Sequence, residues 1–144
     1  MTQAGYSGTP LLKKLGIKPG ARVLLLNAPV GYLALLGPLP ADVTLLSAPV
    51  GPLDFVQLFS RESAEVVEWF PRLKAALAPA GALWISWPKR AARIPTDLWE
   101  NRIRDLGLRH GLVDVKVCAV DENWSGLKFV YRLQDRAALS AESR

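Results

Sequence analysis

The sequence is poor in the residue types that build disulfides and zinc sites. Its 144 residues include one cysteine, Cys118, and one histidine, His110. A single cysteine cannot form an internal disulfide, and one cysteine with one histidine cannot supply the ligands of a structural zinc site. The sequence therefore predicts no metal site of that type and a reducing, cytoplasmic location, and it leaves ligation by carboxylates alone open. We interpret Cys118, which alternates with valines, as a small buried apolar residue.

Long apolar runs are also missing. No stretch approaches the roughly 18 residues that cross a bilayer, and residues 1–5 lack the basic and apolar regions of a signal peptide. The phosphate-binding G-x-x-x-x-G-K loop and the dinucleotide-binding G-x-G-x-x-G loop are absent too. We expect a cytoplasmic protein that does not contact membranes and that neither hydrolyses ATP nor binds NAD by the usual routes.

What remains is the composition of one folded domain. Half of the residues are hydrophobic and 22% are charged, which is typical of a globular chain. A length of 144 residues favours a single domain over residues 1–144, with an N-terminal segment at 1–8 and a polar, frayed tail at 134–144. Lysine and arginine number 18 against 13 acidic residues, and the net charge of +5 favours loose attraction to anions.

Short apolar runs bounded by proline and glycine indicate buried strands. The predicted strands are residues 22–26, 42–47, 54–59, 82–87, 112–120 and 126–133. The last two are separated by residues 121–125 alone, a length that joins antiparallel neighbours, so we predict a C-terminal hairpin.

Short helical segments are predicted near the start of the chain. Pro10 opens the first helix with Thr9 as its N-cap, and Gly16 ends it. Tyr32 begins a second helix of one or two turns.

Two longer helices follow, each with an expected hydroxyl cap. Ser60 is predicted to cap the first, in which Pro71 either kinks the helix or divides it in two. Thr96 is predicted to cap the second, whose Trp99 and Ile103 are expected to face the core.

Strands that alternate with helices predict an α/β fold. We expect a compact, mostly parallel sheet with helices on both faces and an antiparallel C-terminal hairpin. In such sheets ligands bind beyond the carboxyl ends of the strands. That edge would gather five segments that are distant in sequence: residues 27–32, 47–51, 60–61, 86–90 and 121–125.

Polar and aromatic side chains in these segments are the predicted ligand-binding residues. They are Asn27, Tyr32, Trp87, Lys89, Asp121 and Trp124. Asp121 and Glu122 could supply acid–base chemistry or hold a cation, although polar hairpin loops are common without either role. Trp87 next to Lys89 and Arg90 is a combination typical of single-stranded nucleic-acid binding.

A second candidate site precedes the first helix. Ser7 and Thr9 would offer hydroxyl groups near the helix N-terminus and Lys13 a charge, so these three residues are predicted to bind an anion. No acidic residue precedes Asp42, and the same stretch holds three further cations, Lys14, Lys18 and Arg22. Ordinary capping and a solvated lysine face explain the same pattern.

The segments KPGARVLLL, LAPAGALWIS and GLVDVKV, in this order, resemble the Rossmann-like methyltransferase fold over about residues 9–133. The resemblance implies an S-adenosylmethionine cofactor held by an acidic residue and a glycine-rich turn after the first strand. The corresponding positions hold Leu25, Asn27 and Pro29, and only Gly31 is retained. The acid that would hold the ribose falls near Ser47. These positions disfavour the cofactor in its usual pose.

Four motifs carry a closer resemblance: GYSGTPLLKKLGI, LLLNAP, WPK and VDVKVCAVDENWSGLK. They resemble an uncharacterised, mainly bacterial family, the domain of unknown function 3052, over nearly the whole chain. Because that family has no established activity, the resemblance implies a fold and a bacterial origin rather than a reaction.

Three functions follow as hypotheses. We expect a small binding or regulatory domain that holds an anionic metabolite or a protein partner at the carboxyl edge of the sheet. An atypical S-adenosylmethionine-dependent methyltransferase with Asp121 or Glu122 as its base is the first alternative. A nucleic-acid accessory protein that acts through Trp87 is the second. No catalytic residue and no metal ligand set is defined by the sequence.

Overall fold

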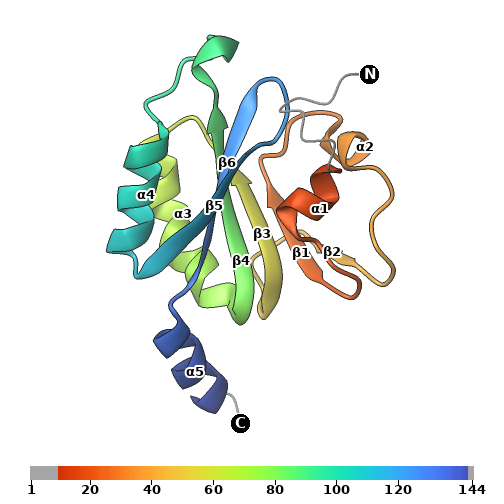
Figure 1. Cartoon of the computed structure of the whole chain (residues 1–144), viewed down its shortest axis with the longest axis vertical. Helices are drawn as coiled ribbons and strands as arrows, with labels where there is room; N and C mark the ends of the chain where they lie inside the picture. The colour runs from red at the N-terminus through yellow and green to blue at the C-terminus, as the bar shows by residue number, and fades with distance from the viewer. Residues whose placement is uncertain (1–9, 143–144) are drawn as a thin grey trace.

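The computed structural model describes residues 10–142, which form one six-stranded sheet with helices packed on it (Figure 1). The strands follow the order β2-β1-β3-β4-β6-β5. β1, β2, β3 and β4 are parallel, whereas β6 is antiparallel to both of its neighbours. This arrangement confirms the predicted sheet and its C-terminal hairpin. The strand bounds are β1 Arg22–Leu26, β2 Thr44–Leu46, β3 Leu53–Phe59, β4 Leu77–Pro88, β5 Leu112–Ala119 and β6 Trp124–Tyr131.

Helices cover both faces of the sheet (Figure 1). Their bounds are α1 Leu11–Leu15, α2 Tyr32–Leu36, α3 Ser63–Ala76, α4 Glu100–Arg109 and α5 Leu133–Glu142, with a short 3-10 turn at Arg90–Ala92. Buried side chains of α3 and α4 share one core with the sheet, and those of α1 and α2 share the other. None of the helices in residues 10–142 is long and apolar enough to cross a membrane.

The central strand β3 shows why the apolar runs become strands. Val56 and Leu58 enter the core under α3 and α4, while Phe55 and Phe59 enter the core under α1 and α2. Alternate side chains of a strand point to opposite faces, so a strand covered on both sides must be apolar at consecutive positions. Between Phe55 and Phe59 the one polar residue is Gln57, which is fully buried and hydrogen-bonded to Tyr32 and Ser86.

Pro71 lies inside a single continuous helix, α3, so of the two predicted alternatives, a kink or a division, the division does not occur. Proline has no N–H to donate to the carbonyl of Val67, four residues earlier. Pro71 is exposed and Val67 is 44% exposed, so this carbonyl lies on the solvent side of the helix. Water can satisfy a carbonyl there, and the helix continues.

Neither hydroxyl cap predicted for the two longer helices occupies an N-cap position. The N-cap residue of α3 is Glu62 rather than Ser60, whose hydroxyl donates to Glu65 Oε1 at 2.5 Å. The N-cap residue of α4 is Trp99 rather than Thr96, whose hydroxyl donates to the carbonyl oxygen of Arg61. Both hydroxyls hold loops that precede their helices.

Trp99 faces solvent, contrary to the sequence prediction. Its side chain is 53% exposed, and the preceding residue, Leu98, takes the buried place with 4% exposure. The helix begins only at Glu100, so the helical spacing assumed for Trp99 does not apply to it. Ile103 is buried as predicted.

The tail predicted to fray forms α5 instead. Leu139 packs against the core under α3 and α4, and α5 contacts β4 at the end of the sheet opposite to the carboxyl ends of the parallel strands (Figure 1). Packing of this apolar side chain contributes to holding the segment on the sheet, a contact that its polar composition did not indicate.

Candidate functional site

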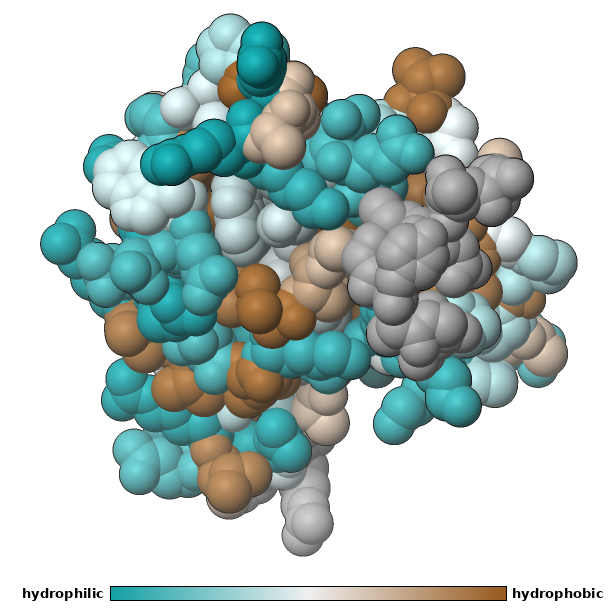
Figure 2. All heavy atoms as spheres, turned by 45° about the horizontal axis from the view of Figure 1, so that its top comes forward, coloured by the Kyte–Doolittle hydropathy of each residue, from teal (hydrophilic) through white to brown (hydrophobic). Residues whose placement is uncertain are grey.

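The carboxyl ends of β1, β3 and β4 and the β5–β6 hairpin meet at one end of the sheet, as predicted (Figure 1). Backbone and side-chain hydrogen bonds join the segments directly. The Ser60 N–H donates to the carbonyl oxygen of Ser86 at 3.0 Å, and the Lys89 N–H donates to that of Asn123 at 2.8 Å. Figure 2 shows a mostly hydrophilic surface at this end, with apolar residues in separate small patches. We call this region the carboxyl edge.

Asn27 turns the chain at the end of β1. Its φ is +57°, a left-handed conformation that asparagine tolerates better than most residues. Its side-chain Nδ2 donates to the carbonyl oxygen of Phe59 at 3.2 Å, which ties the end of β1 to the end of β3. Gly31, with φ +84°, then opens α2. The Asn27 amide is therefore committed to holding the turn.

Tyr32 is buried and belongs to a polar chain beneath the carboxyl edge. Its side chain is 3% exposed, and its hydroxyl donates to Gln57 Oε1 at 2.6 Å. Gln57 Nε2 in turn donates to the Ser86 Oγ at 3.0 Å. Burial raises the pKa of Tyr32 well above its ordinary value, so the hydroxyl stays protonated. These bonds fix α2 to β3 and β4.

Trp87 and Trp124 lie at the same end of neighbouring strands but on opposite faces of the sheet. Trp124 pairs with Pro88, so Trp87, one residue earlier, points the other way. Trp87 is 7% exposed within the core under α3 and α4, whereas Trp124 packs edge-on against Phe59 at 5.3 Å in the other core. The expectation that both indoles line one crevice is wrong.

Asp121 closes the hairpin loop. Its Oδ1 accepts the backbone N–H groups of Asn123 and Trp124, each at 2.8 Å. This is the local turn geometry that aspartate favours, and it engages one oxygen of the carboxylate that we considered as a base. Glu122 is exposed beside it.

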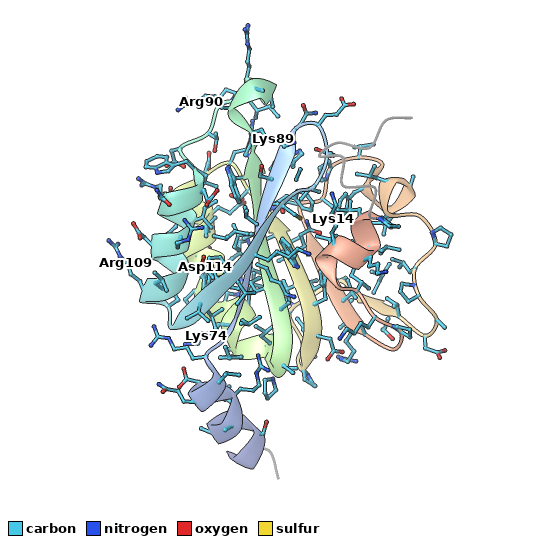
Figure 3. All side chains as sticks on the ribbon, viewed as in Figure 1. Lys14, Lys74, Lys89, Arg90, Arg109 and Asp114 are labelled. Atoms are coloured by element: carbon cyan, nitrogen blue, oxygen red, sulfur yellow. The ribbon has the colours of Figure 1, made fainter. Side chains whose placement is uncertain are left out.

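Several cations at the carboxyl edge are unbonded. Figure 3 places Lys89 and Arg90 at this end, after β4, and Arg61 follows β3. Within residues 10–142, the side chains of these three residues make no hydrogen bond or ion pair. Asp97, by contrast, accepts the Ser63 N–H at 2.7 Å, and this hydrogen bond lowers the pKa of its carboxyl group. The side chains of Arg61, Lys89 and Arg90 can therefore donate to a ligand, whereas the Asp97 carboxylate already has a hydrogen-bond partner.

A hollow of about 440 Å³ opens beside Arg61. Its lining combines residues of the β3–α3 connection and the first turn of α3 with residues before α4: Arg61, Glu62, Ala64, Pro95, Thr96 and Asp97. Thr96 and Asp97 were not among the predicted site residues. Their contacts with Arg61 and Ser63 span more than 30 residues of sequence, so no local pattern indicates them.

The predicted anion site lies partly outside the described residues, which exclude Ser7 and Thr9. Lys13 is exposed on α1, a helix of five residues. The N-cap residue of α1 is Pro10 and the helix begins at Leu11, so the prediction of Thr9 as the cap and Pro10 as the first helical residue is wrong. The Arg22 guanidinium is committed elsewhere, because it donates to the carbonyl oxygens of Pro52 and Val50 at the start of β1.

Other candidate reactive groups have structural contacts. In the described part of the chain no group of three or more histidine, cysteine or acidic residues could hold a metal ion. His110 stacks on Phe70 with 4.7 Å between ring centroids, and its Nδ1 lies 2.8 Å from the Leu106 carbonyl oxygen. Cys118 is half-buried, and burial raises the pKa of its thiol, which disfavours the nucleophilic thiolate.

The carboxyl ends of β1 and β2 do not fit an adenosyl cofactor in its usual pose. Residues 27–32 and 47–51 contain no carboxylate that could accept both ribose hydroxyls. Asn27 has a single acceptor oxygen where a carboxylate has two, and the buried Tyr32 hydroxyl donates to Gln57, so neither side chain reproduces that acid. Pro29 also lacks an N–H in the turn.

No protein-family model matches the chain, and no curated protein matches it. The resemblance to the domain of unknown function 3052 therefore stays a prediction.

Solved methyltransferase structures share the fold. Ribosomal protein L11 methylase from Lactobacillus delbrueckii subsp. bulgaricus has a TM-score of 0.58 at 14% identity, covering 85% of this chain and 75% of that one. A SAM-dependent methyltransferase from Aquifex aeolicus has 0.57 at 17% identity, covering 83% and 86%. Magnesium protoporphyrin IX methyltransferase from Synechocystis PCC 6803 with bound SAM has 0.60 at 15% identity, covering 85% and 74%. The likeness shows a methyltransferase-like fold.

Proposed function

We propose that this chain is a ligand-binding domain on a methyltransferase-like scaffold, and that a small anionic molecule or an acidic segment of a protein partner binds at the carboxyl edge. The observation that carries the proposal is the set of unbonded donors there. The side chains of Arg61, Lys89 and Arg90 have no hydrogen-bond or ion-pair partner among residues 10–142, while the Asp97 and Asp121 carboxylates accept backbone hydrogen bonds. An anion would meet donors that the protein itself leaves unused.

Direct contacts with these side chains, rather than the net charge of the carboxyl edge, would hold the ligand. Exposed Glu62 and Glu122 lie in the same loops, so the formal charges of the region nearly cancel. Specificity would come from geometry: the hollow beside Arg61 on one side and Lys89 on the other, supported by a rigid base of engaged side chains.

Methyl transfer is the second candidate function, because the solved structures that share the fold include methyltransferases with bound SAM. This observation supports the fold. The residues at the ends of β1 and β2 argue against the cofactor, so we place binding first.

A nucleic-acid function through Trp87 loses its physical basis. Base stacking needs an accessible ring, and Trp87 is 7% exposed within the core. The exposed indole of residues 10–142 near these loops is Trp99, and Arg102 already covers it at 5.1 Å from its ring centroid.

Two measurements test the proposal. Isothermal calorimetry with S-adenosylhomocysteine should give no binding heat, and saturable heat would support methyl transfer instead. A thermal-shift screen of small carboxylates and phosphomonoesters should yield a compound that raises the melting temperature, because a ligand that binds only the folded state stabilises it.

The variant Lys89→Ala/Arg90→Ala should abolish that shift, and Arg132→Ala, which removes an exposed cation in the turn between β6 and α5, should preserve it. A hit that both variants retain would contradict binding at the carboxyl edge.

A further inference from the structure

Four lysines, Lys14, Lys18, Lys116 and Lys128, lie on the face of the sheet that α1 covers. Lys116 and Lys128 are register partners on β5 and β6. Lys116 Nζ donates to the carbonyl oxygen of Lys14 at 2.9 Å, which places the end of α1 over the pair. Lys18, shortly after α1, acts electrostatically on Lys128. We call these residues the lysine cluster. Figure 3 shows Lys14 on α1, away from Lys89 and Arg90.

The arrangement is electrostatically unfavourable without a ligand. Directly opposed residues on antiparallel strands have Cβ atoms about 4.5–5.5 Å apart, and like charges in such pairs are destabilising. Lys128 is half-buried, and burial together with the charges of Lys116 and Lys18 lowers its pKa. The salt bridges within residues 10–142 join Arg104 to acidic residues on the α4 side, and none involves the cluster.

A structural role explains only part of the cluster. The Lys116 ammonium bonds the Lys14 carbonyl, and the next carbonyl, of Leu15, accepts a hydrogen bond from Trp84 Nε1 at 3.0 Å. The end of α1 is thereby closed without Lys18 or Lys128. The ammonium groups of Lys14, Lys18 and Lys128 make no hydrogen bond within residues 10–142. A neutral side chain at position 128 would fill the same space without repulsion.

We propose that the lysine cluster binds a compact polyvalent phosphate anion, a diphosphate group either free or carried by a larger molecule. Lys116 and Lys128 are paired across two strands, the Lys128 ammonium lies 3.9 Å from where a Cβ of Gly16 would be, just after α1, and Lys18 is close enough to act on Lys128. These charges come from separate elements rather than from one line along the surface, and neighbouring ammonium groups suit a small anion with several oxygens, since each is a point charge with three donors. An extended polyanion would favour a stripe of cations instead.

The test is calorimetry of the full chain with inorganic diphosphate at fixed ionic strength. The variant Lys18→Gln/Lys128→Gln removes two charges of the cluster and leaves the Lys116 bond to α1 intact. Its matched control, Arg109→Gln/Arg132→Gln, removes two exposed cations that make no side-chain hydrogen bond within residues 10–142; Figure 3 shows Arg109 on α4, across the sheet.

We expect saturable binding of diphosphate, weakened at least about tenfold by Lys18→Gln/Lys128→Gln and less than about twofold by the control. Equal weakening by both double variants would mean diffuse charge attraction and would overturn the proposal, as would the absence of saturable binding. Adenosine diphosphate in a second titration separates the sources: equal affinity indicates a site for the phosphates alone, and tighter binding indicates a carried diphosphate. Competition by a single-stranded oligonucleotide at much lower concentration would favour nucleic acid and overturn the compact-anion reading.

Two further measurements separate this proposal from folding effects and from the carboxyl edge. Without ligand, Lys128→Gln should melt no lower than the unsubstituted protein, since it relieves like-charge repulsion; a lower melting temperature would indicate a structural lysine and contradict the account. Arg61→Ala/Arg90→Ala should leave diphosphate affinity unchanged. Loss of affinity in that variant would assign the anion to the carboxyl edge instead.

Discussion

Removing the Tyr32 hydroxyl tests whether the buried polar chain supports the carboxyl edge. Tyr32→Phe keeps the ring, which packs at 4.8 Å from Phe59, and removes the donor to Gln57 Oε1. Gln57 is fully buried, so its oxygen would lose its partner without gaining water. Leaving such a group unsatisfied costs about 1–3 kcal/mol. For a domain of this size that corresponds to a fall of about 4–10 °C in melting temperature.

Urea unfolding followed by circular dichroism would measure this change. A double-mutant cycle with Gln57→Leu isolates the Tyr32–Gln57 bond, because the double variant no longer buries an unpaired oxygen. We expect a coupling energy of about 1 kcal/mol or more between the two positions. A Tyr32→Phe protein within about 0.3 kcal/mol of the unsubstituted one would refute the role given to this bond.

The same residue predicts a dependence on alkaline pH. Burial raises the pKa of Tyr32, so the folded protein keeps the proton where the unfolded chain begins to lose it. The unfolded state then binds fewer protons, and the free energy of unfolding falls as pH rises above about 10. Tyr32→Phe should reduce this fall and leave the part due to Tyr131, whose pKa burial also raises. Identical slopes in both proteins would contradict the assignment.

Three further predictions concern the frame around the edge. Gly107→Ala should destabilise the fold by about 1–3 kcal/mol in thermal melts, because its Cβ would overlap the Phe129 ring; an unchanged melting temperature would mean that α4 can shift. Asp97→Asn should weaken the hydrogen bond that caps α3. Because the pKa of Asp97 is lowered in the folded state, the stability that its charge contributes should be lost as the pH falls below about 4. The substitution should therefore make the free energy of unfolding less dependent on pH in that range. Trp87→Ala should cost about 3–5 kcal/mol and Trp99→Ala under about 1 kcal/mol by urea unfolding, and the reverse order would show that the wrong indole was placed in the core.

The parts of the fold that the sequence predicts well are those set by burial on both faces. The strand at residues 22–26 coincides with β1, and the apolar runs at 54–59 and 82–87 lie within β3 and β4. The apolar composition of each of these segments is enough to predict that it forms a strand. The gathering of loops at the carboxyl edge followed from parallel pairing, which short apolar runs separated by helices imply.

The parts that could not be predicted depend on partners distant in the chain. The opposite facing of Trp87 and Trp124 depends on which residue of β4 pairs with which residue of β6, and a shift of one position would reverse it. The opposition of Lys116 and Lys128 depends on an irregularity in β5 after Asp114. Such registers are set by the packed sheet rather than by local sequence.

Helix starts failed for the same reason. Ser60 and Thr96 are residue types that favour caps, yet the amide at the start of α3 is bonded by Asp97, 34 residues away. Gln57 is a polar residue in an otherwise apolar run of the sequence. Its hydrogen bonds to Tyr32 and Ser86 explain how a polar side chain is accommodated there.

The central claim is that the carboxyl edge of this methyltransferase-like sheet offers hydrogen-bond donors to an anion but lacks the residues that bind an adenosyl cofactor in its usual pose. Amide chemical shifts recorded by NMR during titration with S-adenosylhomocysteine test it most directly. We predict that the amides of Asn27, Gly31 and Ser47 do not move, whereas an anionic compound from the thermal-shift screen moves those of Arg61, Lys89 and Arg90. Saturable shifts at Asn27 and Gly31 with the adenosyl compound would contradict the account.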